Sequence, residues 1–380
     1  MEDMAITHNG FWVNKRVLIT GHTGFKGSWL TLLLLKLGAE VWGYSLEADK
    51  NFSLFENLNL NDKNNNPFFS SFNHQIGDIN NFNKLSKFTL NCNPDIVFHL
   101  AAQPLVLESY KDPINTWNTN VLGTIKLLES LKCLKKKLSI VVVTTDKVYL
   151  NKKSDFCYKE TDQLGGYDPY SASKAAVEIA VSSWRSSFCN QNKNLISIAT
   201  ARAGNVIGGG DWSKNRLVPD AIRSLINKSA IPLRNPNFIR PWQYVLDPLR
   251  GYIILAEKLY SAPEKLKQDN KFAREFNFGP SNDLEKSVLN LVQEILNNWE
   301  GDFYITKNEN PQYESSRLTL SSELSMKLLG WESIMSFSSG VRNTVNWYKS
   351  FYRQENCLEF SIKEIDHFLN IVDKYSNKVF

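Results

Sequence analysis

The chain has 380 residues, enough for two domains or for one large α/β unit with an added lobe. Its formal charge is +5, and its 44 basic residues are spread along the chain, which argues against a nucleic-acid-binding protein. The five cysteines are scattered and form no C-x-x-C pair, so we expect neither a disulfide framework nor a zinc site. The five histidines lack the spacing of metal ligands, so we predict no metal site.

Neither end of the chain nor its apolar stretches predict a membrane protein. The first residues, "MEDMAITHNG", lack the basic start and apolar run of a signal peptide. The most apolar stretch, "WLTLLLLKLG" from Trp29, contains Lys36 and is far shorter than the ~20 residues that cross a bilayer. We therefore expect a buried helix there, and a cytoplasmic protein whose partner is a small molecule rather than nucleic acid or a membrane.

Short β-branched segments alternate with helical ones from Lys15 onward, a pattern typical of a parallel sheet. The predicted strands span residues 16–20, 40–45, 74–77, 95–101, 138–145 and 195–201. The Asn-rich segment 56–69, which contains Pro67, predicts an exposed loop of variable conformation. The expected fold is a Rossmann-like, doubly wound α/β sheet.

The pattern changes after residue 203, where Gly208, Gly209 and Gly210 are followed by several prolines. This indicates a smaller, irregular lobe. We predict a first domain of residues 10–203 plus a returning segment of about 240–262, in which residues 246–260 look helical and should pack on the sheet. The lobe would then comprise residues 204–239 and 263–350, and residues 351–380 would form a helical tail.

A glycine-rich turn in "VLITGHTGFKGSWL" follows the first predicted strand and opens a helix. Gly21, Gly24 and Gly27 permit a tight turn, and the helix N-terminus offers unpaired N–H groups to a pyrophosphate. The turn, with Thr23 and Phe25, predicts dinucleotide binding; a purely structural turn is the alternative. Its G-x-x-G-x-x-G spacing resembles the extended short-chain dehydrogenase/reductase superfamily.

The ends of the next strands give weaker cofactor signals. The second strand ends at Ser45, where an acidic residue would usually hold a ribose hydroxyl, so Glu47 or Asp49 is a possible substitute. No arginine follows to hold a 2′-phosphate, which favours NAD over NADP.

Two further strand ends resemble cofactor contacts of that superfamily. Asp78 and Ile79 follow the third strand, where the superfamily uses an aspartate to meet the adenine amino group. The fourth strand ends in "HLAA", whose Leu100, Ala101 and Ala102 would let the backbone approach the cofactor. A turn and a tightly packed strand end are the structural alternatives.

Tyr170 and Lys174 in "YSASK" are four residues apart and should share one face of a helix. A phenol titrates near ~10 and is a poor base at neutral pH. A neighbouring ammonium and a positive nicotinamide ring stabilise the phenolate, so the tyrosine can accept an alcohol proton. The pair therefore predicts alcohol–ketone redox chemistry.

The fifth predicted strand stops in "VVVTTDKVYL", which places Thr145, Asp146 and Lys147 side by side. Ligands gather beyond the carboxyl ends of the strands in an open parallel sheet. Thr145 would share a substrate hydroxyl with Tyr170, which is enough for a reductase. The additional acid/base pair indicates a second reaction on the ketone, and a solvated Asp-Lys turn is the alternative.

Six segments together resemble the CDP-glucose 4,6-dehydratase family from about residue 11 to 350: "GHTGFKGSWL", "HLAAQPLV", "TTDKVY", "LGGYDPYSASKAAVE", "ARAGNVIGGGDW" and "NPNFIRPWQYVLDPLRGY". Related dTDP- and GDP-sugar dehydratases carry Asp-Glu where this chain has Asp146-Lys147. The resemblance implies an NAD-binding first domain and a lobe that binds the sugar nucleotide.

The resemblance also implies a redox-neutral cycle. Tyr170, helped by Lys174 and Thr145, removes the C4 hydroxyl proton while NAD takes hydride from C4. Lys147 then takes the acidified C5 proton while Asp146 protonates the departing C6 hydroxyl, and hydride returns to C6. As a base, Lys147 must be neutral, which requires a desolvated pocket or a nearby cation; it could instead only polarise the ketone.

The substrate contacts that we predict are one residue of the "HLAAQPLV" segment and four of the lobe, since arginine pairs match the oxygens of a pyrophosphate: Gln103, Asn205, Arg216, Arg234 and Arg240. A surface ion pair is the alternative for any single arginine. The chain departs from the family pattern at Leu107, where arginine is favoured, and at Tyr313, where histidine is usual.

Two other functions fit part of these features. A sugar-nucleotide epimerase or ketoreductase would keep Tyr170 and Lys174 but would not require Asp146 and Lys147. A cofactor-sensing binding protein would typically have lost the tyrosine or the lysine. Helices at about 114–135 and 170–189 occupy the positions through which relatives dimerise, so a homodimer or a dimer of dimers is expected.

Overall fold

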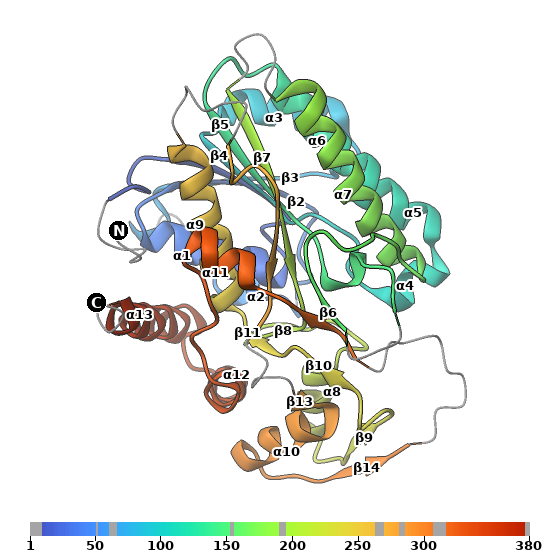
Figure 1. Ribbon diagram of the computed structural model, residues 1–380. Helices are drawn as coiled ribbons and strands as arrows, with labels where there is room; N and C mark the ends of the chain where they lie inside the picture. Colours follow the sequence, from blue (N-terminus) through green and yellow to red (C-terminus); the bar gives the residue numbers. More distant parts are fainter. Residues whose placement is uncertain are drawn as a thin grey trace.

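A seven-stranded parallel sheet forms the centre of the molecule (Figure 1). The computed structural model describes residues 10–50, 52–60, 67–152, 156–189, 195–262, 270–280, 286–306 and 317–376. The strand order is β12-β7-β5-β4-β1-β2-β3, which confirms the predicted doubly wound sheet. Its strands are β1 (Arg16–Thr20), β2 (Glu40–Ser45), β3 (Phe72–Ile76), β4 (Ile96–His99), β5 (Leu138–Val143), β7 (Ile196–Ala203) and β12 (Glu275–Phe278).

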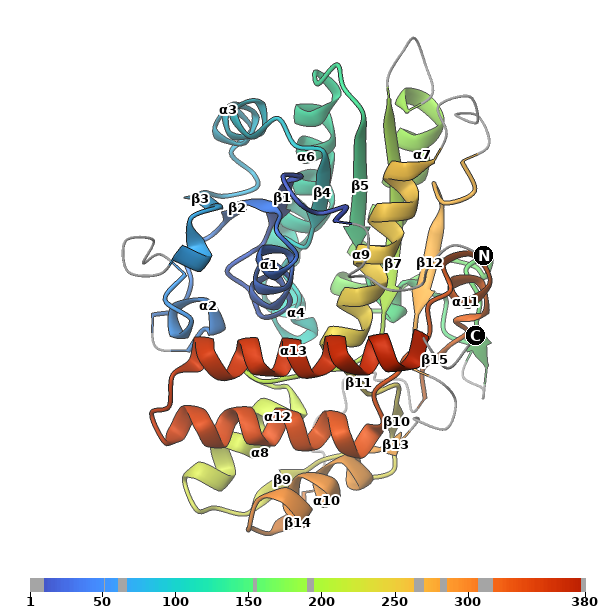
Figure 2. The same ribbon diagram turned by 90° about the vertical axis from the view of Figure 1, so that its left-hand side faces the viewer.

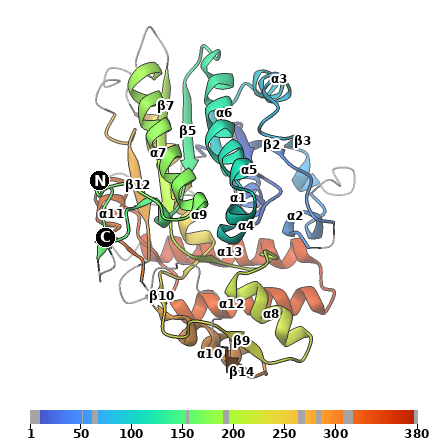
Figure 3. The same ribbon diagram turned by 90° about the vertical axis from the view of Figure 1, so that its right-hand side faces the viewer.

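Helices cover both faces of the sheet (Figures 2 and 3). One face packs against α1 (Phe25–Lys36) and α9 (Leu246–Ser261), and the other against α3 (Phe82–Cys92), α6 (Gly123–Lys132) and α7 (Pro169–Phe188). Side chains alternate between the two faces, so Val17 and Ile19 join the first core and Leu18 the second. Strands buried on both faces must be apolar throughout, which is why their sequences are so easily recognised.

The first helix follows directly from its sequence. Gly24 is the N-cap of α1, and every residue from Gly27 to Leu35 is buried. The helix ends before Gly38, whose φ of +87° lies in the left-handed region that glycine tolerates. The prediction of a buried helix is confirmed, as is that of a helix at 246–260, which is α9. No helix within the described ranges is long and apolar enough to cross a membrane.

The crossover after β2 differs from the prediction. Segment 56–69 was expected to be an exposed loop, but Leu58 and Leu60 are fully buried. The short helix α2 (Leu54–Asn57), capped by the Ser53 hydroxyl, turns these leucines into the core. The prediction is therefore wrong for these residues, because asparagine-rich composition hid the apolar spacing. Residues 61–66 lie outside the described residues.

A smaller lobe lies below the carboxyl ends of the strands (Figure 1). It contains α8 (Leu217–Ile226), β9 (Ile231–Leu233), α10 (Val288–Asn298) and β14 (Phe303–Ile305). The predicted lobe included all of 263–350, whereas β12 from this range pairs with β7 in the central sheet. The predicted helical tail corresponds to α13 (Cys357–Ser376), which packs beside α12 (Phe337–Tyr352) and crosses beneath α1 and α9 (Figure 2).

Candidate active site

A cleft of about 1740 Å³ opens where the parallel strands end, between the sheet and the lobe. Apart from the possible substitutes Glu47 and Asp49, all the residues predicted for the site line it, although their roles stay predictions: Gly21, Thr23, Gly24, Phe25, Gly27, Asp78, Ile79, Leu100, Ala101, Ala102, Gln103, Thr145, Asp146, Lys147, Tyr170, Lys174, Asn205, Arg216, Arg234 and Arg240. Leu107 lines the cleft as well, and Tyr313 lies outside the described residues.

The glycine turn leaves no room for larger residues. A Cβ on Gly21, whose φ is +79°, would lie 2.7 Å from the Ala101 nitrogen, and a Cβ on Gly27 would lie 2.1 Å from the Gly21 carbonyl oxygen. The backbones of β1, β4 and the start of α1 therefore meet closely at the floor of the cleft. The exposed amide groups at this helix start can receive a pyrophosphate, so the residues present fit a dinucleotide.

The residues at the end of β2 that line the cleft differ from those predicted. Ser45 lines the cleft, and its hydroxyl is 2.7 Å from the Thr23 hydroxyl of the glycine turn. Glu47 and Asp49, the predicted acidic substitutes, are exposed and do not line the cleft. Asp78 does line it, and its carboxylate accepts a 2.8 Å bond from the Asn80 amide.

Thr145, Asp146 and Lys147 meet just beyond the end of β5. Thr145 caps the one-turn helix η3 (Asp146–Val148) and donates a 2.9 Å hydrogen bond to Asp146 Oδ1. Lys147 Nζ lies 3.2 Å from the same oxygen, with 29% of its side chain exposed. Asp146 Oδ2 is buried without a hydrogen-bond partner among the described residues. A buried carboxylate oxygen needs a partner, so this atom is available to a substrate hydroxyl.

Tyr170 and Lys174 lie on the first turns of α7, as predicted. Asp168 caps this helix by accepting from Ser171 N at 2.9 Å, and Pro169 occupies its first position. Both Tyr170 and Lys174 are buried and line the cleft. Lys174 Nζ donates a 3.2 Å hydrogen bond to the Val143 carbonyl, which joins the helix to the end of β5.

Burial sets the protonation of this pair. It raises the pKa of Tyr170 to about 12, opposed by a hydrogen bond with Thr145 and by the charge of Arg216. Burial also lowers the pKa of Lys174 to about 8, opposed by the carboxylate of Glu178. Tyr170 is therefore a neutral phenol at pH 7 in the protein alone, and it needs a further positive charge nearby to become a base.

Lys26, inside the glycine turn, is a cleft residue that the sequence analysis missed. Its ammonium is 3.5 Å from the Tyr252 hydroxyl. Burial, followed by the charges of Arg216 and Lys174, lowers its pKa to about 7, while Asp146 opposes this shift. Nothing in a glycine pattern marks its fourth variable position as a functional one, so only the fold shows that a further lysine faces Lys174 and Asp146.

The predicted substrate residues differ in how much of their side chain is already engaged. Gln103 donates to the Leu105 carbonyl and the Thr116 hydroxyl and accepts from the Leu105 amide, so its amide shapes the loop after β4. Arg216 is 3.0 Å from Asp211, and Arg234 is exposed at the cleft wall.

The last two predicted substrate residues are more enclosed. Asn205 Oδ1 is buried with no hydrogen-bond partner within the described ranges, so it can receive a donor from a ligand. The Arg240 side chain is buried beside Phe238, at 5.3 Å from the ring centre. Both therefore suit contacts with a bound molecule at the inner wall of the cleft.

Comparison with known proteins agrees with this architecture. The family model described as GDP-mannose 4,6 dehydratase matches residues 18–344. A CDP-glucose 4,6-dehydratase of Salmonella typhimurium is 42% identical over 364 residues, which cover 95% of this chain and 98% of the relative. A dTDP-glucose 4,6-dehydratase of Escherichia coli is 28% identical over 283 residues, covering 68% and 73% of the two chains.

The fold is also similar to that of solved enzymes. The dTDP-glucose 4,6-dehydratase DesIV of Streptomyces venezuelae, solved with NAD, superposes with a TM-score of 0.74 at 22% identity over 90% of this chain and 99% of its own. The epimerase Mth375 of Methanothermobacter thermautotrophicus superposes with a TM-score of 0.73 at 22% identity, over 91% and 96% of the two chains.

Proposed function

Because this chain belongs to the GDP-mannose 4,6-dehydratase family, we propose that it is a CDP-glucose 4,6-dehydratase, which converts CDP-glucose into CDP-4-dehydro-6-deoxy-D-glucose and water. The observation that carries this proposal is the pair Asp146 and Lys147 beside Tyr170 and Lys174 in one cleft. Oxidation at C4 needs only the latter two with Thr145. A second acid/base pair on the strand end supports elimination of water.

The cofactor is NAD, and the chain offers it a closely fitting floor. When bound, NAD accepts hydride from C4 of the sugar and gives it back at C6. The residues that would hold it are those of the glycine turn and the following strand ends: Gly21, Thr23, Gly24, Phe25, Gly27, Asp78, Ile79, Leu100, Ala101, Ala102, Tyr170 and Lys174. Side chains at Gly21 or Gly27 would collide with the backbone that forms this floor.

Tyr170 is the base of the first step. Its phenolate form takes the C4 hydroxyl proton while Thr145, a hydrogen-bond partner of Tyr170, holds the same sugar oxygen. The cationic form of Lys174 stabilises the phenolate, and the positive nicotinamide supplies the second charge that the buried phenol needs.

Asp146 and Lys147 carry out the elimination. The C4 ketone acidifies the C5 hydrogen, which Lys147 removes, while Asp146 protonates the departing C6 hydroxyl. The free Oδ2 of Asp146 is the atom placed to meet that hydroxyl. The 3.2 Å contact between Lys147 Nζ and Asp146 Oδ1 lets a proton pass between the two groups as the elimination proceeds.

Replacing Lys147 by alanine should abolish hydrogen exchange at C5. With CDP-glucose and NAD in D2O, the wild-type protein is expected to place deuterium at C5. CDP-glucose recovered from the reaction with Lys147→Ala should carry no deuterium at C5. The reason is that no other group in this variant removes the C5 proton. Proton NMR of the recovered sugar nucleotide makes the measurement.

A matched control for this variant is Lys152→Ala. Lys152 forms a similar ion pair with Asp162, at 3.3 Å, on the following loop. The control should exchange C5 hydrogen at the wild-type rate. Retained exchange in Lys147→Ala would show that Lys147 only polarises the ketone and that another group is the base.

The nucleotide diphosphate would be held by the lobe. Arg216, Arg234 and Arg240 line its wall of the cleft, and the unpaired Asn205 Oδ1 faces the same space. Guanidinium groups match pyrophosphate oxygens in pairs, which supports these residues as the substrate contacts. Cytidine as the base is supported by the relative that is 42% identical.

The proposed activity is tested by incubating the protein with catalytic NAD and one sugar nucleotide at a time. CDP-glucose should give the 4-dehydro-6-deoxy sugar and no net NADH, while dTDP-glucose, UDP-glucose and GDP-mannose should react at most slowly. Epimerised or reduced product in place of water loss would favour the alternative enzymes. Bound NAD with no turnover of any of the four would contradict the proposal.

We also infer that the protein assembles through α4 (Val106–Lys111), α5 (Pro113–Trp117), η2 (Asn118–Leu122) and α7, which lie side by side (Figure 3). Five large apolar side chains are exposed on these neighbouring helices: Tyr110, Ile114, Trp117, Leu122 and Ile179. Apolar exposure of this kind is typical of an interface between copies. A homodimer, alone or paired into a tetramer, is the assembly proposed.

Replacing Ile179 by lysine should weaken that assembly. Ile179 is 62% exposed, so the free monomer tolerates the charge, whereas a dimer interface would bury it. Sedimentation at micromolar concentration should show a shift toward monomer. Ile305→Lys is the control, since Ile305 is 64% exposed on β14, outside the apolar surface; a wild-type monomer would contradict the proposed interface.

The cytoplasm is the proposed place of action. An odd number of scattered cysteines without a C-x-x-C pair is typical of a protein kept in reducing surroundings. The proposed substrate and cofactor are both charged small molecules, which suits the same compartment.

A further inference from the structure

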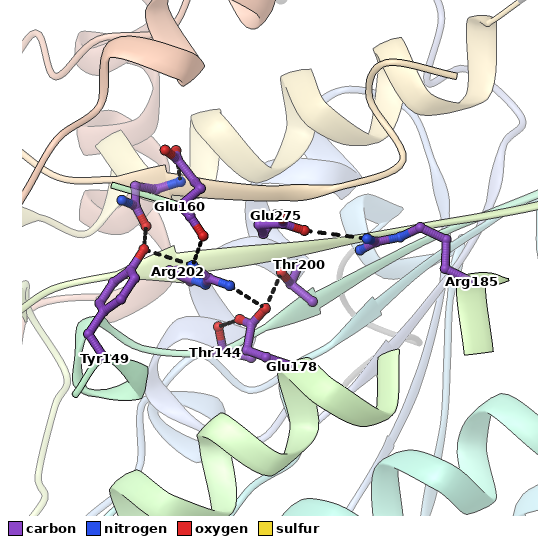
Figure 4. Close-up of polar contacts among 9 residues, drawn as sticks. Thr144, Tyr149, Glu160, Glu178, Arg185, Thr200, Arg202 and Glu275 are labelled. Carbon is purple, nitrogen blue, oxygen red and sulfur yellow. Dashed lines mark hydrogen bonds and ion pairs between the residues drawn. The ribbon is translucent and has the colours of Figure 1, made fainter. Parts of the chain in front are cut away.

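A buried ion pair lies directly behind the catalytic residues, and the mechanism above does not use it (Figure 4). Glu178 on α7 and Arg202 on β7 approach to 2.9 Å, and each side chain is only 3% exposed. Burying two charges is costly even when they are paired, so stability alone gives little reason for such a pair. Its hydrogen bonds indicate a different purpose.

Glu178 and Arg202 hold the two ends of the catalytic segment 145–148. Glu178 accepts a 2.5 Å hydrogen bond from Thr144, the residue before Thr145. Arg202 donates a 2.8 Å bond to the hydroxyl of Tyr149, the residue after the segment. Figure 4 shows Thr144 beside Glu178 and Tyr149 beside Arg202.

Neighbouring strands anchor this arrangement. The Thr200 hydroxyl donates to Glu178 at 2.7 Å, and the Tyr149 hydroxyl donates to Asn277 on β12 at 2.6 Å. Segment 145–148 is therefore fixed to α7, β7 and β12 by Glu178, Arg202 and Asn277, none of which lines the cleft. Such support sets the positions of catalytic groups to within fractions of an ångström.

Glu178 also acts on Lys174, which stands one helical turn before it on α7. Its carboxylate raises the pKa of Lys174 against the effect of burial. The other titratable or charged groups that face Lys174 are Lys26 from α1, His99 from β4 and Tyr170 on its own helix. Lys26 opposes the cationic form of Lys174 and His99 is neutral, so Glu178 is the anion that favours it.

We propose that Glu178 is a positioning residue of the dehydratase reaction: with Arg202 it clamps both ends of segment 145–148, and its charge keeps Lys174 cationic. This inference rests on the proposed function. Glu178 lies outside the cleft, yet it would fix the positions of Asp146 and Lys147 for the elimination step. It would also maintain the positive charge of Lys174 that the oxidation step uses.

The test compares Glu178→Gln with the wild-type protein in the presence of NAD and CDP-glucose. Above its pKa, Lys174 loses the charge that stabilises the Tyr170 phenolate, so kcat/KM should fall on the alkaline side. Without the carboxylate, that fall should move about 1–2 pH units lower, as expected for a unit charge about 6 Å away at an effective dielectric constant of ~20. NMR titration of 15N-labelled lysine, assigned with Lys174→Met, should show the same shift without substrate or cofactor.

Two variants separate charge from geometry. Glu178→Asp keeps the charge but shortens the side chain, so the alkaline limb should stay in place while kcat falls about tenfold through the lost contact with Thr144. Glu275→Gln is the matched control. Glu275 on β12 pairs at 3.3 Å with Arg185, which lies on α7 about 16 Å along the helix axis from Lys174 (Figure 4). Loss of the Glu275 charge should change neither the alkaline limb nor kcat.

A wild-type alkaline limb and a wild-type Lys174 signal in Glu178→Gln would overturn the inference. If that variant fails to fold, Glu178→Asp and Thr144→Val decide the matter, because wild-type kcat in both would also overturn it. If the wild-type protein does not convert CDP-glucose at all, the proposed function fails instead, and the lysine titration still measures what Glu178 does to Lys174.

Discussion

Replacing Tyr170 by phenylalanine should lower kcat for CDP-glucose by about 10³-fold or more, within the range found for positioned acid/base groups. The substitution removes the only atom of this side chain that can take the C4 proton and leaves the ring in its buried site. Because phenylalanine keeps the ring and its packing and loses only the hydroxyl, the melting temperature should change little. Steady-state rates and a melting curve on the same preparation give both values.

The control for this variant is Tyr304→Phe. Tyr304 lies on β14, is 53% exposed and does not line the cleft, so the same loss of a hydroxyl should leave kcat unchanged. Activity of Tyr170→Phe within a factor of ten of wild type would contradict the assignment of Tyr170 as the base of the oxidation step.

Asp146→Asn should stop water loss while oxidation at C4 continues. An amide cannot protonate the departing C6 hydroxyl, so formation of product should fall by about 10²–10⁴-fold. Tyr170 and Lys147 remain, and recovered CDP-glucose should still acquire deuterium at C5 in D2O. This outcome is the opposite of that expected for Lys147→Ala, so the pair of variants assigns the two roles separately.

Asp162→Asn provides the matched control, because Asp162 forms another Asp–Lys ion pair, with Lys152, on the neighbouring loop. It should convert CDP-glucose at the wild-type rate. Undiminished product formation by Asp146→Asn, or loss of C5 exchange together with product, would contradict the role of Asp146 as the acid of the elimination.

The central sheet and the cleft could be predicted because their sequence signals are local. Strands covered on both faces are mostly apolar, as β5 is apart from Ser139, and the glycine turn must be free of side chains where β1 meets α1. Tyr170 and Lys174 share a helix face at four-residue spacing, which the sequence states directly. Each of these features depends on neighbours in the chain.

Features that depend on distant partners escaped prediction. β12 is four residues long and alternates phenylalanine with polar residues, and only its pairing with β7 makes it a strand of the sheet. Leu58 and Leu60 are buried because α2 turns them inward. Glu178 looks like a surface residue of an amphipathic helix until Arg202, 24 positions away, is placed against it.

Side-chain roles within the cleft were harder still. Gln103 belongs to a recognisable segment, yet its amide is engaged by Leu105 and Thr116, contacts that no motif reveals. Lys26 was overlooked because the residues between glycines in such turns vary. Its approach to Arg216, Lys174 and Asp146 arises only when α1 and the strand ends meet around one cavity.

The central claim is that, within one cleft, hydride is removed from C4 and returned to C6 of the same sugar, so that the C6 hydroxyl can leave. The most direct measurement follows CDP-glucose deuterated at C4, incubated in ordinary water with the protein and catalytic NAD, by mass spectrometry and NMR of the product. The account predicts 4-dehydro-6-deoxy product with the deuterium at C6. Deuterium lost to solvent or still at C4, or a sugar that keeps its C6 hydroxyl, would contradict it.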